Sequence, residues 1–325
     1  MRYILGVDGG ASKTLIGLAD EAGNLLAVSR RGSTNYQTAS VDAVCQEISE
    51  GVREAFARAG IPQRRAATAW LCLAGLDVPA DYKVMREAIA RLGLAERFWL
   101  DNDIVGALAG ALAGRPGVVV NSGTGAVAIG QDSRGQQHRA DGWGHILGDD
   151  GSGYDIGRRA MRAAMRSYDG RGPATLLTDK LIAHLALESL EDLVTKAYVE
   201  GMSPDQVAAL APLVEEAAQE GDEVARQILR QAGRELAHTA LSIMKKLALK
   251  GEDAQVATVG GVFTSSLVRE AFEEGLGQKA NVVEPRFSPL VGAISLALKE
   301  LGVEPEEKIL AAMEEAAASF LKAES

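Results

Sequence analysis

The feature that most constrains the fold of this chain is a short pattern that occurs twice: an apolar strand, a polar residue, a glycine turn and a second strand. One copy is Val7-Asp8-Gly9-Gly10 and the other is Val120-Asn121-Ser122-Gly123. Short apolar runs separated by turn residues surround both copies, at 3–7, 14–19, 25–29, 117–121 and 126–130. Each copy therefore predicts an antiparallel meander. Two related halves would explain the repetition, but the repeat is too short to establish a duplication.

The rest of the chain alternates strands and helices, which predicts an α/β fold. Helices are expected at 40–59, 80–92 and 103–113, with strands at 68–73 and 97–100. Beyond the second meander, 151–249 is mostly helical, strands at 255–259 and 280–284 flank a helix at 264–276, and 305–322 is an acidic amphipathic helix. Arg115-Pro116 is the expected boundary between lobes at 1–115 and 116–325, with helix 305–322 a candidate to pack back on the first lobe.

Composition excludes several classes of protein. Hydrophobic residues make up 47% of the 325 residues and charged residues 24%, as in an ordinary globular protein. The 34 Lys and Arg against 44 Asp and Glu give a net charge of −10, which argues against a nucleic-acid or anionic-membrane binder. No apolar run reaches the roughly 18–20 residues that span a bilayer, so a cytoplasmic protein without a membrane partner is expected. Cys45 and Cys72 stand among apolar residues and are expected to be buried, reduced thiols.

The segment Asp8-Gly9-Gly10-Ala11-Ser12-Lys13-Thr14 is a candidate phosphate turn. Its two glycines permit positive φ, so successive backbone N–H groups can point at a phosphate. Ser12 and Thr14 add hydroxyls, and Asp8 is suited to a hydrated Mg²⁺. Lys13-Thr14 suggests a Walker loop, but that motif needs glycine before the lysine and a helix after it, whereas a strand is expected here. A simple hairpin turn is the alternative for this motif taken alone.

The segment Ser122-Gly123-Thr124-Gly125-Ala126 is a second candidate phosphate turn. It also fits a loose dinucleotide-binding fingerprint, with Asp141 near the distance expected for a ribose ligand. That fingerprint must open a helix, and the alternation from Ala126 to Gly130 predicts a strand. Two phosphate turns therefore fit the chain better than a dinucleotide site.

Four further segments carry polar groups suited to a sugar or a nucleotide. Asp101-Asn102-Asp103 lies at the carboxyl end of a strand, where a carboxylate can accept a proton from an attacking hydroxyl or merely cap a helix. The glycine-rich segment 142–153 contains Asp149, a natural acceptor for sugar hydroxyls, and His145, which we interpret as a core or turn histidine. Ser33-Thr34-Asn35-Tyr36 either contributes to a site or caps the next helix. Gly260-Gly261 suits close approach of a purine and ribose.

In their order and spacing these segments resemble the N-acetylglucosamine kinase group of the sugar-kinase/actin-like ATPase superfamily, which includes the glucosamine kinases and the BadF/BadG/BcrA/BcrD-type activator ATPases. The resemblance runs from Asp8-Gly9-Gly10 to Gly260-Gly261-Val262 and is most telling at Trp143-Gly144-His145 with Gly148-Asp149. Ala126 stands where some members have serine, and Asp150 where glutamate is common.

The resemblance implies two ribonuclease-H-like lobes, the second enlarged by helices, that close a central cleft over ATP, Mg²⁺ and an amino sugar. The implied reaction transfers the γ-phosphate to the 6-hydroxyl of N-acetylglucosamine, glucosamine or a close relative, with Asp103 as general base, and a homodimer is expected. The implied sugar contacts are Thr34, Asn35, Asp103, Gly125, Ala126, Gly144, Asp149 and Gly153. The implied nucleotide contacts are Gly9, Gly10, Ser12, Lys13, Thr14, Ser122, Gly123 and Thr124 for the phosphates and Gly260 and Gly261 for adenosine, with Asp8 holding Mg²⁺ through water.

Two alternatives stay open within this resemblance. One is an activator ATPase of a benzoyl-CoA reductase or 2-hydroxyacyl-CoA dehydratase system, which needs cysteine thiolates in a subunit-facing loop for an iron–sulfur cluster. Cys45 falls in an expected helix and Cys72 in an expected strand, which disfavours that role. The other is a sugar-binding homologue without catalysis, which the presence of Asp8 and Asp103 disfavours.

Overall fold

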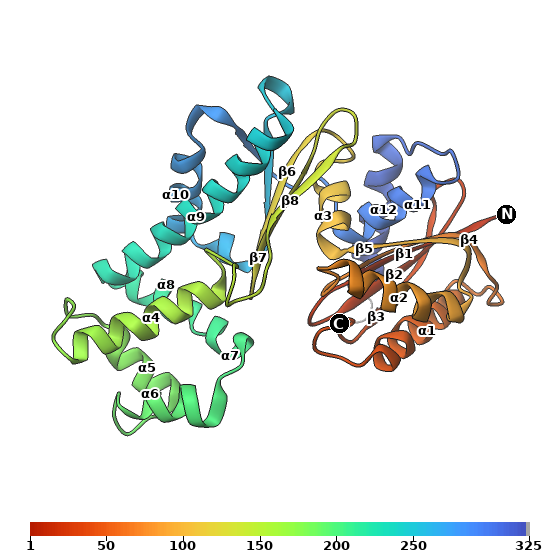
Figure 1. The fold of residues 1–325 in the computed structure, drawn as a ribbon. Helices are drawn as coiled ribbons and strands as arrows, with labels where there is room; N and C mark the ends of the chain where they lie inside the picture. The colour runs from red at the N-terminus through yellow and green to blue at the C-terminus, as the bar shows by residue number, and fades with distance from the viewer. Residues whose placement is uncertain (323–325) are drawn as a thin grey trace. The chain divides into compact units, whose positions relative to one another are not determined.

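The computed structural model describes residues 1–322, which form two compact units. The first unit contains residues 1–115 and the chain from Glu284 onward, and the second contains Pro116–Val283. In Figure 1 the first unit is coloured from red to golden yellow, with dark blue for its C-terminal part, and the second unit is coloured from yellow through green to lighter blue. The expected division kept 116–325 together apart from a return of helix 305–322, whereas in the structure the whole stretch from Glu284 joins the first unit.

The first unit is built on a five-stranded sheet of order β3-β2-β1-β4-β5. Its strands are β1 (Tyr3–Gly9), β2 (Thr14–Asp20), β3 (Leu25–Arg31), β4 (Ala66–Leu73) and β5 (Ala95–Asn102). The first three form the expected antiparallel meander, and β4 and β5 add in parallel to β1. Alternate residues of β1 point to opposite faces, so Leu5 packs with one set of helices and Ile4 with another.

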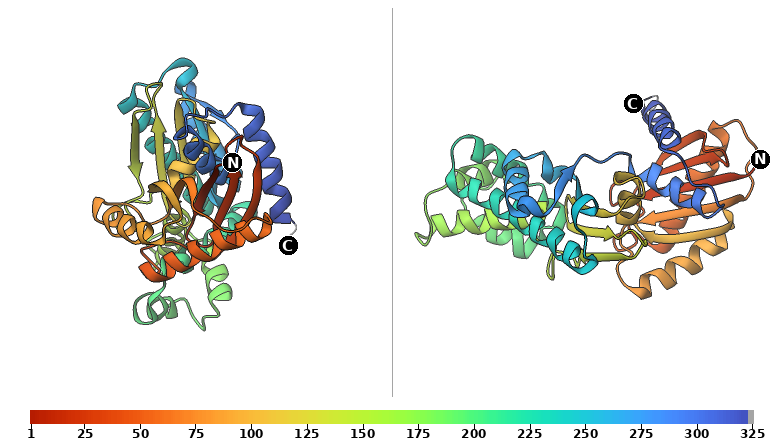
Figure 2. Two further views of the ribbon diagram at one scale, coloured as in Figure 1. Left: turned by 90° about the vertical axis from the view of Figure 1, so that its right-hand side faces the viewer. Right: turned by 90° about the horizontal axis from the view of Figure 1, so that it is seen from above.

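One face of this sheet packs against α1 (Val41–Arg58) and α2 (Pro79–Leu92). The helices α3 (Asp103–Ala111), α11 (Pro289–Lys299) and α12 (Glu307–Lys322) belong to the other side. Figure 2 shows α12, the last blue helix, beside the red strands. No element was expected at 289–299, yet Leu290, Val291 and Ile294 of α11 are fully buried against the sheet. This buried apolar helix explains why the chain from Glu284 belongs to the first unit.

The second unit repeats this topology and adds helices to it. Its strands are β6 (Gly117–Ser122), β7 (Ala126–Gln131), β8 (Gln137–Asp141), β9 (Gln255–Val259) and β10 (Asn281–Val283), in the order β10-β9-β6-β7-β8. Its helices are α4 (Gly153–Tyr168), α5 (Leu177–Leu185), α6 (Asp192–Val194), a π-helix (Thr195–Gly201), α7 (Pro204–Ala208), α8 (Ala211–Gln219), α9 (Glu223–Leu247) and α10 (Ser266–Leu276), with 3-10 turns at Gly251–Asp253, Gly261–Thr264 and Gly277–Lys279. Strand β8 was not expected from the sequence.

Starting from β8, the second sheet is again a three-stranded antiparallel meander followed by two parallel strands. The prediction of an α/β fold with two ribonuclease-H-like lobes, the second enlarged by helices, is thus confirmed. In each unit the parallel strands end at one edge of the sheet, because Gly9 pairs with Leu73 and Leu73 with Asn102, while Asn121 pairs with Val259. The segments after these strands therefore emerge side by side.

The expectations drawn from composition can be checked in the same structure. Cys45 in α1 is half-buried, Cys72 in β4 is fully buried, and neither forms a disulfide. Burial raises the pKa of both thiols, so they stay protonated at neutral pH. Within residues 1–322, no helix is both long and apolar enough to span a bilayer.

Candidate functional site

In the first unit the candidate phosphate turn is the tight connection from β1 to β2. The Gly10 N–H donates to the Lys13 carbonyl at 2.9 Å, and the Thr34 N–H donates to the Gly10 carbonyl at 3.3 Å. Ser12 and Lys13 are exposed at the tip of the turn, while Gly9 is buried at its base. The turn thus presents a hydroxyl and an ammonium group to solvent from a fixed backbone.

The hydroxyls of Thr14 and Thr34 do not face solvent. Both side chains are fully buried, and their Oγ1 atoms share a hydrogen bond of 2.8 Å. Thr14 was expected at the phosphates and Thr34 at the sugar, whereas in this structure their side chains join the hairpin to the loop 33–38. We therefore assign these hydroxyls a structural role.

Two carboxylates, Asp8 and Asp103, interact beside this turn. Asp8 is the next-to-last residue of β1, and Asp103 is the first residue of α3. Burial, and after it the charge of Asp103, raise the pKa of Asp8 to about 7, and the charge of Lys13 acts in the opposite direction. Because the negative charges of the two carboxylates repel each other, a cation bound between them would stabilise their ionised forms.

The neighbours of Asp103 have structural partners. Asn102, rather than either aspartate, caps α3, because its Oδ1 accepts from the Ile104 N–H at 3.2 Å. Asp101 accepts from Trp70 Nε1 at 3.0 Å, and the Trp70 ring stacks on Trp99 with centroids 5.5 Å apart. Burial raises the pKa of Asp101, and the Trp70 hydrogen bond opposes this shift. Asp101 is thus held in the sheet, which leaves Asp103 as the better candidate base.

Asn35 lies in the loop 33–38 and is half-buried. Its Oδ1 accepts from the Gln37 N–H at 2.9 Å, which fixes the orientation of the amide. Among residues 1–322 its Nδ2 has no hydrogen-bond partner, so this donor is available to a ligand hydroxyl.

In the second unit the turn 122–125 is bound to the start of α4. The N–H groups of Gly153 and Tyr154 donate to the carbonyls of Gly123 and Thr124 at 2.8 and 3.1 Å. Ser122 Oγ donates to the Gly151 carbonyl at 3.0 Å. Gly123 and Thr124 are thus fixed by the helix after the glycine-rich segment, and Gly153, an expected sugar contact, lies against the expected phosphate turn.

The glycine-rich segment is organised by Asp141, for which the sequence suggested only a role as a ribose ligand. Its carboxylate accepts from the N–H groups of Gly142, Asp149 and Asp150 at 2.8, 2.7 and 3.1 Å. Asp149 has a φ of 61°, and a Cβ on Gly125 would lie 2.9 Å from its Oδ2. The structure therefore brings together Gly125 and Asp149, two of the expected sugar contacts.

The remaining expected contacts of this segment differ in exposure. Gly144 is exposed in the loop, whereas Ala126 is buried at the start of β7. His145 is exposed in a turn, and its ring lies 4.8 Å from that of Tyr154 in α4, so of the two alternatives it is the turn histidine and not a core one.

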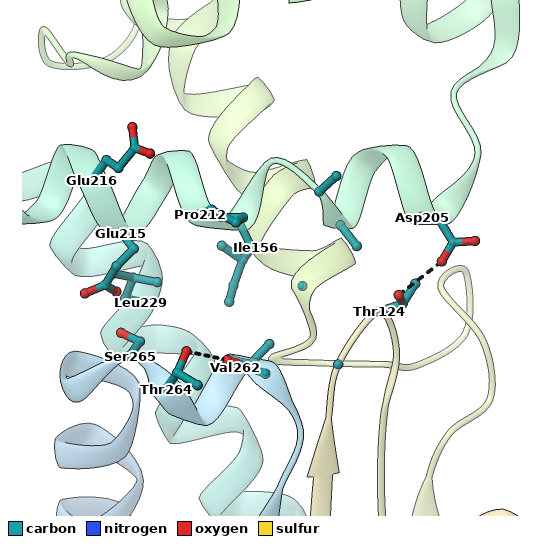
Figure 3. Close-up of a pocket in the computed structure, with 16 residues that line it drawn as sticks. Thr124, Ile156, Asp205, Pro212, Glu215, Glu216, Leu229, Val262, Thr264 and Ser265 are labelled. Atoms are coloured by element: carbon teal, nitrogen blue, oxygen red, sulfur yellow. Dashed lines mark hydrogen bonds between the residues drawn. The ribbon is translucent and has the colours of Figure 1, made fainter. Parts of the chain in front are cut away.

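A cavity of about 640 Å³ opens beside the turn 122–125, and Figure 3 shows its lining. Gly123, Thr124, Gly153 and Gly261 contribute to its wall, together with the apolar side chains of Ile156, Pro212, Leu229 and Val262. Gly260 has a φ of 100°, and a Cβ there would lie 2.1 Å from the Ser122 carbonyl oxygen, so the two glycine segments are in direct contact. The expected phosphate and adenosine segments of the second unit thus meet at one cavity, whose size suits a nucleotide.

The three acidic residues of this cavity, Asp205, Glu215 and Glu216, were not singled out from the sequence. Asp205 accepts from Thr124 Oγ1 at 3.1 Å, as the dashed line in Figure 3 marks. Glu215 on α8 points toward the cavity, its Oε1 accepts from Gln219 Nε2 at 3.2 Å, and its Oε2 is buried without a hydrogen-bond partner in the described structure. All three lie in a helical stretch where an acid has no recognisable motif, so no local signal could have identified them.

The pair Asp8 and Asp103 in the first unit offers donor chemistry for a cation. Residues 1–322 contain no group of three or more His, Cys, Asp or Glu side chains arranged to hold a metal. Mg²⁺ is commonly held by one or two carboxylates together with substrate phosphates and water. Asp8 with Asp103 fits that pattern, because the repulsion between them would be relieved by a divalent ion.

Comparisons with known proteins agree with the motifs. The model of the BadF/BadG/BcrA/BcrD ATPase family matches residues 5–297. An N-acetylmuramic acid/N-acetylglucosamine kinase of Clostridium acetobutylicum is 31% identical over 304 residues, which cover 92% of this chain and 99% of that protein. An N-acetyl-D-glucosamine kinase of Dictyostelium discoideum is 31% identical over 309 residues, or 90% and 97% of the two chains.

Among solved structures, a Chromobacterium violaceum protein provisionally assigned as an N-acetylglucosamine kinase superposes with a TM-score of 0.76. It is 30% identical, and the match covers 92% of this chain and 99% of that one. The resemblance inferred from the motifs is therefore confirmed: the chain belongs to the BadF/BadG/BcrA/BcrD ATPase family.

Proposed function

We propose that this protein is an ATP-dependent amino-sugar kinase that transfers the γ-phosphate to the 6-hydroxyl of N-acetylglucosamine, glucosamine or a close relative. The observation that carries the proposal is the coupled pair Asp8 and Asp103 beside an exposed lysine turn. Such a pair suits phosphoryl transfer, which needs charge neutralisation at the phosphate and a group to take the acceptor's proton. The two curated relatives are named as kinases of N-acetylated amino sugars, which supports the choice of acceptor.

In the first unit, Asp103 would accept the proton of the attacking hydroxyl. Asp8 would hold Mg²⁺ through water, and this ion neutralises charge on the transferred phosphate. Lys13 and Ser12, exposed on the turn, would bind phosphate oxygens. Asn35 would donate its unpartnered Nδ2–H to a sugar hydroxyl.

In the second unit, the cavity beside the turn 122–125 would bind the nucleotide. Its apolar wall suits a purine, and the buried Oε2 of Glu215 suits a ribose hydroxyl, which would supply the missing donor. Asp149 would accept hydrogen bonds from the sugar, because its carboxylate lies against Gly125 and its backbone is fixed by Asp141.

A coupled assay of ADP release tests this function directly. Purified protein with ATP and Mg²⁺ is offered N-acetylglucosamine, glucosamine, N-acetylmuramic acid and N-acetylmannosamine in turn. We expect sugar-dependent ADP release with at least one of them, and none with its 6-deoxy analogue. ADP release that no sugar stimulates would contradict the proposal, and iron in the purified protein would favour an activator ATPase instead.

A further inference from the structure

The segment Ala74–Asp77, which comes directly after β4, contacts several parts of the candidate site within the first unit. The Ala74 N–H donates to the Gly9 carbonyl of the phosphate turn at 2.7 Å. Asn102, the residue before the candidate base, donates from Nδ2 to the Leu76 carbonyl at 3.2 Å. This short segment thus lies between the turn that carries Asp8 and the helix that carries Asp103.

The same segment reaches the loop of Asn35 through Gly75 and Asp77. Gly75 has a φ of 82°, and a Cβ there would lie 2.4 Å from Asn35 Oδ1, so only glycine permits this approach. Asp77 Oδ2 accepts from Gln37 Nε2 at 2.8 Å, and its Oδ1 accepts from Asn102 Nδ2 at 3.2 Å. One carboxylate therefore joins the loop of Asn35 to the N-terminus of α3.

Asp77 and Asn102 are fixed in this connection, whereas Gln37 is not. The Asp77 N–H donates to Asp81 Oδ2 at 3.1 Å, which ties the residue to the start of α2. Asn102 cannot rotate its amide, because its Oδ1 is used by the Ile104 N–H. Gln37 is exposed and its amide is free to rotate, so the two partners of Asp77 differ in how they respond to a change at this position.

We propose that Asp77 is a positioning residue that sets Asn35 and Asp103 relative to each other; as a statement about catalysis, this rests on the proposed function. Asp77 bonds to the residue before Asp103 and to the residue whose N–H orients the Asn35 amide. Loss of the carboxylate would release both at once. A misplacement of about 1 Å between a catalytic group and its substrate can cost on the order of 10²-fold in rate.

A positioning carboxylate and a catalytic one respond differently to asparagine. In Asp77→Asn the new Oδ1 can accept from Asn102, and the new Nδ2 can donate to Gln37 once the Gln37 amide rotates. The geometry is then kept while the charge is lost. In Asp77→Ala both hydrogen bonds are lost.

The kinetic test compares these variants on the sugar that wild type phosphorylates. We expect Asp77→Ala to lower kcat/KM for the sugar by about 10- to 100-fold with both kcat and KM affected, and Asp77→Asn to stay within about threefold of wild type. Gln37→Ala should mainly raise the KM. Gln46→Ala removes a comparable amide–carboxylate bond to Glu50 on α1 and should change neither constant. Equal losses in Asp77→Asn and Asp77→Ala, or wild-type kinetics in Asp77→Ala, would overturn the proposal.

Hydrogen exchange tests the same role without reference to any substrate. The amides of Gln37 and Ile104 are protected by Asn35 and Asn102, so Asp77→Ala should speed their exchange together, whereas Asp77→Asn should not. Unchanged exchange at both amides in Asp77→Ala overturns the inference, even if no sugar is a substrate. Faster exchange in a protein inactive on every sugar would instead sink the proposed function and keep the positioning role.

Discussion

The two units share one sheet topology but use it differently. In each, a glycine turn joins the first two strands of the meander, at 9–13 between β1 and β2 and at 122–125 between β6 and β7. The first turn carries Lys13 and lies beside two coupled carboxylates, whereas the second contains no charged residue and is bonded to α4. The shared topology places a turn at the sheet edge, and the charges around it decide its chemistry.

The units differ also in the segment that comes after the meander. Between β3 and β4 the chain forms the single helix α1, while the equivalent stretch between β8 and β9 holds α4 to α9. Those added helices supply Ile156, Pro212, Glu215 and Leu229 of the cavity. We therefore expect substitution of the carboxylates Asp8 and Asp103 in the first unit to act on the chemical step, and substitutions around the cavity and Asp149 in the second unit to act on binding.

The sharpest test of this difference is Asp103→Asn, for which we expect the largest effect. General-base catalysis contributes roughly 10²–10⁴-fold, so kcat should fall by about that factor with little change in the KM for the sugar. Asn102 provides the cap of α3, so the melting temperature should stay within a few degrees of wild type. A near wild-type kcat in steady-state kinetics would remove Asp103 from this role, and Asp101→Asn would then be tested in its place.

Asp8→Asn should separate stability from activity. The pKa of Asp8 is raised to about 7, so the folded state binds this proton more tightly than the unfolded state, and the resulting penalty grows as pH rises from about 4 to 7. The amide removes a penalty of up to about 4 kcal/mol, at 1.36 kcal/mol per pKa unit. We expect thermal unfolding to show a gain over wild type that is larger at pH 8 than at pH 5, together with loss of Mg²⁺-dependent activity.

An equal melting temperature of Asp8→Asn and wild type at both pH values would contradict that coupling.

The raised pKa of Asp8 should also affect the activity of the wild-type protein. Only the ionised Asp8 can hold a hydrated cation, so the Mg²⁺ concentration needed for half-maximal rate should rise as pH falls below about 7.

In the second unit, Asp149→Ala should weaken sugar binding and leave the nucleotide alone. Hydrogen bonds to a charged group contribute about 1.5–3 kcal/mol, so the Kd of the sugar should rise roughly 10- to 150-fold by calorimetry. Asp150→Ala, at the exposed neighbouring residue, is the matched control. Unaltered sugar affinity in Asp149→Ala would reduce Asp149 to a loop residue.

The sequence predicted the features that local patterns encode. The first meander, the first two strands of the second, the helices 103–113 and 264–276 and the two glycine turns were recognisable, because alternation, helical spacing and turn residues act over a few positions. Helix α11 was missed because a short, predominantly apolar segment shows little amphipathic period. Strand β8 was missed because its residues are mostly polar and at most partly buried.

The parts of the site that the sequence could not provide depend on long-range contacts. Thr14 and Thr34 have the composition of ligand-binding residues, yet they bond to each other across 20 residues of chain. Asp77 and Asp141 are single acids whose partners lie up to 40 residues away, and Glu215 is distinguished only by a buried oxygen without a partner. Residue type and spacing carry no record of such pairings.

That buried oxygen leads to the smallest expected effect, in Glu215→Ala. If Oε2 accepts from a ribose hydroxyl, its removal should cost about 1.5 kcal/mol, the lower end of the range for a hydrogen bond to a charged group, because Oε1 already bonds to Gln219. This corresponds to roughly a 10-fold rise in the Kd of ATP. The variant should also lose discrimination between ATP and either its 2′-deoxy or its 3′-deoxy analogue. The analogue that lacks the hydroxyl bound by Glu215 already lacks this hydrogen bond, so the substitution should not weaken its binding. Glu216→Ala is the matched control, since Glu216 lines the same cavity but pairs with Lys180 on its exposed side. If Glu215→Ala and wild type prefer ATP over the two deoxy analogues to the same extent, Glu215 does not contact the ribose. The cavity would then bind the nucleotide through its apolar wall alone.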